Sequence, residues 1–349
     1  MNLSKNKTIQ RSILFFIIFI GIGIMYLKVQ PTSSDMNENW PTFLKDREFS
    51  CLIEYNGWIY AGGANGLYRI NLETRADEEV KINQRSLSMV RALYIDETNR
   101  LWVGHRNGLS ILGEKIVTIN SEDGLLNTQI LDFLPMENGR VLASTFDGIA
   151  LIEKDTVVEF IKEAPYLPGP TIKSLYYDSQ GFTWYGAFSN LGGGITVKRD
   201  DHIQKFSIES GLIHDNITSI VETEKNTILI GSGLHTKGGA NELAWDEGSW
   251  RIVRTLTKSD GLVGDKVRHI FIDDEQYYWF CSEYDGVAIL KDMKSVRILN
   301  TETGLSHNEV KIILKDSEKD LWLGTKSGLT VIPKSWLTNN LYSVLNNEQ

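Results

Sequence analysis

Short apolar segments alternate with polar turns along most of this chain, and the same arrangement returns seven times. Its clearest copy is residues 321–329, Leu-Trp-Leu-Gly-Thr-Lys-Ser-Gly-Leu, followed by residues 101–109, Leu-Trp-Val-Gly-His-Arg-Asn-Gly-Leu. Weaker copies occupy residues 59–67, 141–149, 183–195, 228–243 and 278–287. One glycine of each copy can be aligned (Gly66, Gly108, Gly148, Gly194, Gly239, Gly286 and Gly328), with a mean spacing of about 44 residues, the length of one propeller blade. A unit of this size cannot bury its apolar face alone, so the seven units are expected to stack on one another.

Each repeat predicts a blade of four strands. A Gly-Leu pair precedes a short first strand, as in residues 124–130, 211–217, 261–267 and 304–310. A polar turn, the Trp-x-Gly strand, a glycine-centred turn and a third apolar strand follow, and most repeats add a more polar fourth strand. Seven such units describe an all-β, seven-bladed β-propeller of four-stranded antiparallel blades. The last repeat supplies only three strands up to Ile332, so its fourth must come from residues 336–345 or 40–44, and we favour the N-terminal source.

The order of these phrases resembles that of the two-component regulator propeller family. Its repeats combine a Gly-Leu turn, a Val-x-x-Ile strand, an acidic turn and a Leu-Trp-Ile-Gly-Thr segment before a second Gly-Leu. The resemblance covers residues 45–335, and it weakens where Tyr60, Leu142 and Leu229 replace the tryptophan. It implies the propeller fold and an extracytoplasmic sensing role, because in that family the propeller commonly forms the sensing part of a receptor kinase. No kinase or DNA-binding segment follows in this sequence, so we expect a separate signalling receptor as a partner.

The N-terminal segment predicts a membrane anchor. Residues 13–27 are an unbroken apolar run that follows Lys5, Lys7 and Arg11, which is typical of export with the N-terminus kept inside. We expect a signal anchor or transmembrane helix at residues 1–29, a tether at 30–44 that can supply a closing strand, and the propeller at 45–349. No Ala-x-Ala-like cleavage site follows the run, but a cleaved signal peptide remains the alternative. Either way, the propeller is expected outside the cytoplasm, in the periplasm or at the cell surface.

Charge and cysteine usage restrict the partners. The whole chain has a net charge of −9, although its first 29 residues carry four cations and no acid, so the propeller is strongly acidic. Such a surface repels nucleic acid, which we do not expect as a partner. Cys51 and Cys281 fall in blades one and six, too far apart for the roughly 7 Å Cα separation of a disulfide, and are expected as buried free thiols. Their spacing gives no metal signature, and no cofactor is expected.

One position of the first strands has unusual charge. In a propeller these strands line the central channel, and the residue after their first Val or Ile is Arg91, Leu131, Lys173, Thr218, Arg268 or Lys311, with Ser50 as the counterpart in blade one. Four of the seven are cations, which would focus positive potential and favour an anionic ligand. In the alternative interpretation, these side chains turn to solvent or pair with neighbouring acids.

The loops of the same face carry further candidates. The turns between strands two and three contain His105, Phe146, Phe188 and Tyr284, beside His235, and the loops between blades contain His214 and His307. Aromatic rings beside hydrogen-bonding groups suit a sugar, so the predicted ligand-binding residues are Arg91, Lys173, Arg268, Lys311, His105, Phe146, Phe188 and Tyr284. Trp102, Trp184, Trp279 and Trp322 instead recur at blade period and predict packing between blades.

We therefore expect a membrane-anchored sensory propeller that binds an anionic oligosaccharide, another small molecule or a protein partner. The histidines leave one alternative, a metal-dependent enzyme similar to streptogramin lyases, which place a catalytic histidine and a divalent metal on one propeller face. No sequential pair of metal ligands supports that alternative.

Overall fold

The computed structural model describes residues 38–188 and 193–343. The chain divides into two units, residues 1–36 and 37–349, and the second contains the whole propeller. The expected membrane anchor at residues 1–29 lies outside the described residues. Among the residues that are described, no helix is long and apolar enough to span a membrane.

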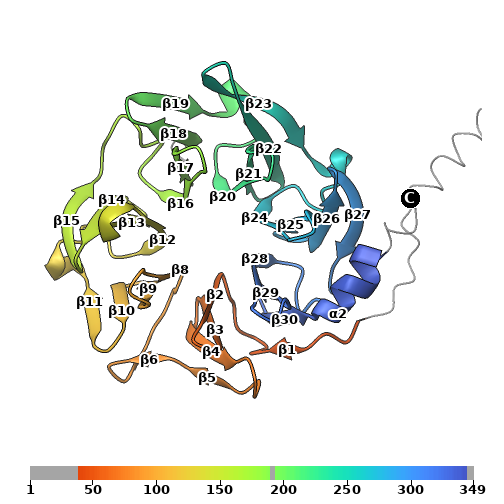
Figure 1. Ribbon diagram of the computed structural model, residues 1–349, viewed down its shortest axis with the longest axis horizontal. Coiled ribbons are helices and arrows are strands. Elements are labelled where there is room, and N and C mark those ends of the chain that lie inside the picture. Colours follow the sequence, from red (N-terminus) through yellow and green to blue (C-terminus); the bar gives the residue numbers. More distant parts are fainter. Residues whose placement is uncertain (1–37, 189–192, 344–349) are drawn as a thin grey trace, which may run out of the picture. The chain divides into compact units, whose positions relative to one another are not determined.

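Seven four-stranded antiparallel sheets surround a common axis, as predicted (Figure 1). Blade one contains β2 (Cys51–Tyr55), β3 (Trp58–Gly63), β4 (Gly66–Asn71) and β5 (Asp77–Glu79). Blade two contains β8 (Ala92–Ile95), β9 (Leu101–His105), β10 (Gly108–Leu112) and β11 (Ile116–Ile119). Blade three contains β12 (Ile130–Pro135), β13 (Val141–Thr145), β14 (Gly148–Glu153) and β15 (Thr156–Ile161). Blade four contains β16 (Ile172–Tyr177), β17 (Thr183–Ala187), β18 (Ile195–Arg199) and β19 (His202–Phe206).

The second half of the ring repeats this order. Blade five contains β20 (Ile217–Glu222), β21 (Ile228–Leu234), β22 (Lys237–Asp246) and β23 (Ser249–Leu256). Blade six contains β24 (Val267–Ile272), β25 (Tyr278–Ser282), β26 (Val287–Lys291) and β27 (Lys294–Leu299). Blade seven contains β28 (Val310–Lys315), β29 (Leu321–Thr325) and β30 (Gly328–Ile332). Short 3-10 turns η1 (Ser121–Asp123), η2 (Glu137–Gly139), η3 (Ile208–Ser210) and η4 (Lys258–Asp260) and a small hairpin, β6 (Lys81–Ile82) and β7 (Arg85–Ser86), complete the loops.

The N-terminal strand closes the ring. β1 (Thr42–Phe43) pairs antiparallel with β30 as the fourth strand of blade seven, with Phe43 opposite Leu329. The Phe43 ring stacks on Trp322 at a centroid distance of 5.4 Å. The other candidate segment forms α2 (Lys334–Trp336) and the π-helix η5 (Leu337–Tyr342), which pack their apolar residues against blades six and seven. The preference for an N-terminal closing strand is therefore confirmed.

The four periodic tryptophans are core residues, as predicted. Trp102, Trp184, Trp279 and Trp322 are all buried, and they join apolar clusters that mix residues of neighbouring blades. Each indole Nε1 donates a hydrogen bond to the aspartate that begins the preceding turn, at 2.7–3.0 Å in Asp96, Asp178, Asp273 and Asp316. The acidic turn and the tryptophan of the repeat are thus one hydrogen-bonded unit.

The glycine of Trp-x-Gly permits close packing of neighbouring blades. A Cβ added to Gly104 would lie 2.6 Å from Ile130, and one added to Gly186 would lie 2.7 Å from Ile217. Ile130 and Ile217 each begin the first strand of the next blade. Cys281 occupies this position in blade six, and both it and Cys51 are buried free thiols, as expected.

Candidate functional site

A backbone irregularity positions the residues nearest the axis. We call Ser50, Arg91, Leu131, Lys173, Thr218, Arg268 and Lys311 the axial residues. In blades three to seven the axial residue is the second residue of the inner strand. The pairing register between the inner strand and its neighbour shifts there, between the first and third residues of the inner strand. Such β-bulges leave one residue unpaired and redirect its side chain. The seven inner strands, which carry or directly follow the axial residues, face the axis in Figure 1.

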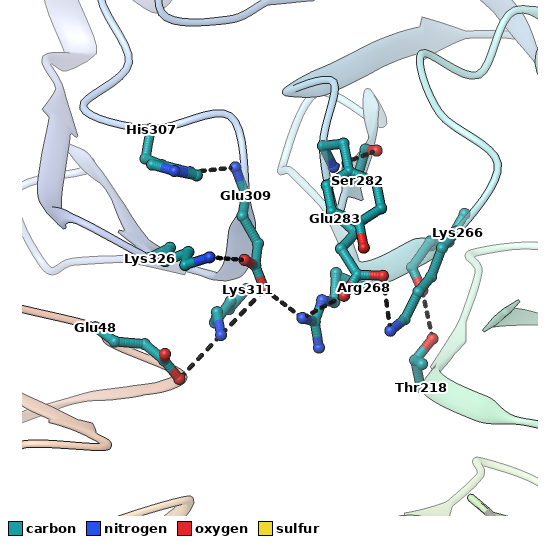
Figure 2. Close-up of polar contacts among 12 residues, drawn as sticks. Glu48, Thr218, Lys266, Arg268, Ser282, Glu283, His307, Glu309, Lys311 and Lys326 are labelled. Carbon is teal, nitrogen blue, oxygen red and sulfur yellow. Dashed lines mark hydrogen bonds and ion pairs between the residues drawn. The ribbon is translucent and has the colours of Figure 1, made fainter. Parts of the chain in front are cut away.

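Two of the four axial cations belong to an ion-pair network at the loop face (Figure 2). Arg268 contacts Glu309 and also Glu283, the latter at 2.9 Å. Lys311 lies 3.1 Å from Glu309 and 2.9 Å from Glu48 of blade one. For these two cations the alternative interpretation, pairing with acids, is the observed one.

Glu309 is the centre of this network. Burial opposes ionisation of its carboxyl group, but Arg268, Lys311 and Lys326 outweigh burial and lower its pKa. Glu309 therefore stays a carboxylate and neutralises cations from two blades.

The network extends to Lys266, which is 4% exposed and lies 2.9 Å from Glu283. Burial above all, then Arg268, lowers the pKa of Lys266, while Glu283 opposes that shift. The Lys266 ammonium also lies 5.6 Å from the centre of the Phe188 ring, one of the predicted aromatic residues.

Arg91 and Lys173 differ from the other two axial cations. Neither forms an ion pair with any residue that the structure describes. Burial is the largest cause that lowers the pKa of Lys173; Asp132 raises it, and Arg91 and Arg268 lower it further. The Arg91 guanidinium lies 5.4 Å from the centre of the Phe146 ring, and its Nη1 is buried without a hydrogen-bond partner. Acids therefore act on these two cations only from beyond ion-pair distance among the described residues, Asp132 on Lys173 and Glu48 on Arg91.

Asp132 is the carboxylate that attracts Lys173, and its role was not predicted from the sequence. Its side chain accepts hydrogen bonds from the backbone N–H of Phe133 at 2.9 Å and of Leu175, in the next blade, at 2.8 Å. Burial raises the pKa of Asp132 to about 6, against the opposing effects of these N–H groups and Lys173. The carboxylate thus links blades three and four and compensates Lys173 only at neutral and higher pH.

The charged partners had a signal in the sequence. Lys266 and Glu309 stand immediately before the first Val of their inner strands, and Glu48 stands immediately before Phe49. An inspection of both neighbours of that apolar residue, rather than only the following one, would have found them. Asp132 is the third residue of the inner strand β12. Ser219, the third residue of the inner strand β20, makes the same type of contact by accepting a hydrogen bond from the N–H of Ile270.

The predicted loop residues fall into two groups. The rings of Phe146 and Tyr284 are 39% and 53% exposed. His105 is buried in blade two, where its Nε2 pairs with the Ser110 hydroxyl at 3.1 Å and its Nδ1 accepts the N–H of Asn107. Burial lowers the pKa of His105 to about 4, so it stays neutral at physiological pH. The structure gives His105 a role inside the blade and leaves the exposed aromatic residues as surface groups.

Two further histidines support loops. Nδ1 of His214 accepts the N–H of Asn216, and Nδ1 of His307 accepts the N–H of Glu309 (Figure 2). Within residues 38–188 and 193–343, no three His, Cys, Asp or Glu residues are grouped in a way that could hold a metal ion.

Three solved structures share the fold with low sequence identity. The extracellular domain of BT4673 from B. thetaiotaomicron, assigned as a one component system, is 18% identical with a TM-score of 0.51, over 85% of this chain and 46% of that one. PorZ, a surface component of the type-IX secretion system of Porphyromonas gingivalis, is 14% identical with a TM-score of 0.58, over 86% of this chain and 48% of that one. A catalytically inactive variant of virginiamycin B lyase from Staphylococcus aureus with quinupristin is 14% identical with a TM-score of 0.62, over 83% and 96% of the two chains. This chain spans less than half the length of the first two, and the likeness to all three shows the fold alone.

The sequence comparison concerns one blade. No curated protein sequence matches the chain. The family model described as two component regulator propeller matches residues 304–327, which contain the Gly-Leu turn, the inner strand and the Trp-x-Gly strand of blade seven. The resemblance found in the sequence is therefore confirmed: this chain is a seven-bladed propeller that carries the two component regulator propeller repeat.

Proposed function

We propose that this chain is a membrane-anchored, extracytoplasmic sensory propeller that binds an acidic oligosaccharide on its loop face. The observation that carries the proposal is that two axial cations have no ion pair among the described residues, and that one of them lies beside an exposed aromatic residue. Arg91 lies beside Phe146, and Lys173 has no ionic partner among the described residues. An acidic sugar has an apolar C–H face that stacks on a ring and a carboxylate that pairs with a guanidinium or ammonium group.

The cellular setting of the proposal rests on two further observations. Residues 13–27 form an apolar run that follows three cations, which supports export and anchoring. A structurally similar propeller is the extracellular domain of a one component system. In this proposal, ligand binding changes the contact between this propeller and a separate signalling receptor.

Isothermal titration of the full chain, solubilised in a neutral detergent, tests the proposal. The ligands are an oligouronide and the same oligosaccharide with its carboxyl groups reduced to alcohols. We expect the acidic form to bind and the reduced form to bind at least tenfold more weakly, because a charge-assisted hydrogen bond contributes about 1.5–3 kcal/mol. Equal affinity for the two forms would remove the charge-based recognition, and no binding of either would leave a protein partner as the alternative ligand.

Two tyrosines give a matched pair of variants for the aromatic part. Tyr284 is 53% exposed at a loop-face turn, whereas Tyr177 is 50% exposed and ends β16 at the opposite face. Tyr284→Ala is expected to weaken binding of the oligouronide roughly two- to tenfold, in line with the value of an aromatic contact. Tyr177→Ala is expected to leave the affinity unchanged. Equal losses in both variants would contradict recognition at the loop face.

The enzymatic alternative gains no support from these contacts. His105 is buried, and His214 and His307 accept hydrogen bonds from their own loops. The likeness to virginiamycin B lyase concerns the fold, which hosts many unrelated activities.

A further inference from the structure

We infer that one small oxyanion group, a carboxylate or a phosphate, is bound at the axis of the ring between Lys173, Arg91 and Arg268. This inference rests on the proposed function and specifies where the acidic group of the ligand is held. It also applies to a free inorganic or organic oxyanion in the absence of a larger ligand.

Three axial cations come from three different blades. Arg91, Lys173 and Arg268 belong to blades two, four and six, which alternate around the ring (Figure 1). Arg91 and Arg268 are both close enough to Lys173 to disfavour its charged form. Like charges that converge from three blades repel one another, and an anion between them would turn this repulsion into attraction.

Two of the axial cations carry buried donor atoms that have no acceptor among the described residues. Nη1 of Arg91 and Nε of Arg268 are buried without a hydrogen-bond partner. Among residues 38–188 and 193–343, the one hydrogen bond of the Arg91 guanidinium is to the Met89 sulfur at 3.4 Å, a weak acceptor. Buried donors in folded proteins nearly always bond to protein groups or ordered water, so these unpaired guanidinium N–H groups are available to an acceptor from outside the chain.

The neighbouring carboxylates do not pair with these donor atoms. Asp132 already accepts two backbone N–H groups, and its raised pKa weakens its charge below about pH 6. Glu283 and Glu309 satisfy the Nη2 atom of Arg268, leaving its Nε unpaired. Arg91 and Lys173 form no ion pair with any described residue, and Glu48 and Asp132 attract them only from beyond ion-pair distance, which leaves close contacts for an external anion.

The donor groups suit an oxyanion better than a halide. Guanidinium groups present several N–H donors in a planar fork, which matches the two or three oxygens of a carboxylate or phosphate. A halide offers one centre to donors that arrive from three blades. An oxyanion can accept from Arg91, Arg268 and Lys173 at the same time, so it is expected to bind more tightly than chloride.

Isothermal titration of the full chain in neutral detergent, with inorganic phosphate, acetate and chloride, tests this inference. We expect one site per chain for phosphate or acetate and at least tenfold weaker binding of chloride. Binding of acetate alone would assign the site to a carboxylate, and binding of phosphate alone would assign it to a phosphoryl group. No binding of either oxyanion would overturn the inference.

Variants locate the site. Lys173→Gln and Arg91→Gln are expected to weaken oxyanion binding at least tenfold, whereas Lys173→Arg retains it. The matched control is Lys205→Gln, an exposed lysine on the outer strand β19 of the same blade as Lys173. Circular dichroism checks that each variant is folded. An unchanged affinity in folded Lys173→Gln and Arg91→Gln, or an equal loss in Lys205→Gln, would show that the ions bind to surface lysines and would overturn the inference.

Competition separates this inference from the proposed function. If phosphate binds at the axis and the oligouronide does not bind, only the proposed function fails. If the oligouronide binds, is not displaced by phosphate and is unaffected by Lys173→Gln, the proposed function stands and the axial site fails.

Discussion

Replacement of Lys173 by methionine is predicted to stabilise the protein. Methionine keeps a flexible side chain of similar length and removes the ammonium group. The folded state disfavours the charged form of Lys173, because burial lowers its pKa and the nearby Arg91 and Arg268 lower it further. The unfolded chain therefore binds this proton more tightly, and the cost of the cation is present at every pH below its lowered pKa.

The gain in stability from Lys173→Met depends on how far Asp132 offsets the cost of the buried ammonium group. Replacing buried charges by apolar side chains is often neutral or stabilises by about 1–4 kcal/mol. We expect about 1 kcal/mol, the lower part of this range, because Asp132 partly compensates Lys173. For a propeller of this size, that corresponds to a rise in Tm of about 2 °C.

The pH dependence gives the prediction its sign. Burial raises the pKa of Asp132 to about 6, so this carboxyl group is charged at pH 8 and mostly protonated at pH 5. At pH 5 the protonated Asp132 no longer compensates Lys173, so Lys173→Met is expected to stabilise the protein more than it does at pH 8. At pH 8 the same substitution leaves a buried Asp132 carboxylate without its cation, and the gain is expected to shrink.

Thermal unfolding followed by tryptophan fluorescence measures this change, in cationic buffers with chloride as the only anion so that no oxyanion occupies the axis. Lys205→Met is the control, and its stability is expected to change by less than about 0.5 kcal/mol, as for most exposed positions. If Tm of Lys173→Met fell by about 4 °C or more, a loss of about 2 kcal/mol on the same scale, Lys173 would be a paired structural cation. The reasoning would then be wrong.

Three further predictions concern the ring and its thiols. Phe43→Ala is expected to cost about 2 kcal/mol, since the part-buried ring stacks on Trp322, and to increase hydrogen exchange in β30; unchanged exchange in β30 would contradict closure by β1. Gly186→Ala is expected to cost about 1–3 kcal/mol, because its Cβ would lie 2.7 Å from Ile217, and part of the loss should be recovered in the double variant with Ile217→Ala. A double variant without such recovery would show that the strain arises elsewhere. Cys51 and Cys281 are expected to resist iodoacetamide at pH 8 in the native protein and to react fully in denaturant. The reason is that burial raises the pKa of both thiols, that of Cys51 to about 12. Stoichiometric labelling of the native protein would refute their burial.

The fold was predictable because its signals repeat. Trp102 and Trp322 mark equivalent strands, and a pattern that recurs seven times outweighs its weak copies at Tyr60, Leu142 and Leu229. Counting strands also showed that blade seven lacked one strand after Ile332, but it left two candidate segments, and the pairing of β1 with β30 decides between them.

The site was predictable only in part. Spacing identified the axial residues, because the β-bulge recurs in register with the repeat. Spacing could not separate Lys311, which pairs with Glu48 from the other end of the chain, from Lys173, which has no such partner among the described residues. That difference depends on contacts between blades that are distant in sequence, and a residue-by-residue reading does not contain them.

An oxyanion is expected to bind where Arg91, Lys173 and Arg268 converge from three blades, and anomalous diffraction tests this most directly. Crystals of the full chain would be soaked in selenate, whose selenium marks a tetrahedral oxyanion. The account predicts one strong anomalous peak at the axis, within hydrogen-bond distance of Lys173 Nζ and Arg91 Nη1, which is lost in Lys173→Gln. Peaks confined to exposed lysines, with none at the axis, would contradict it.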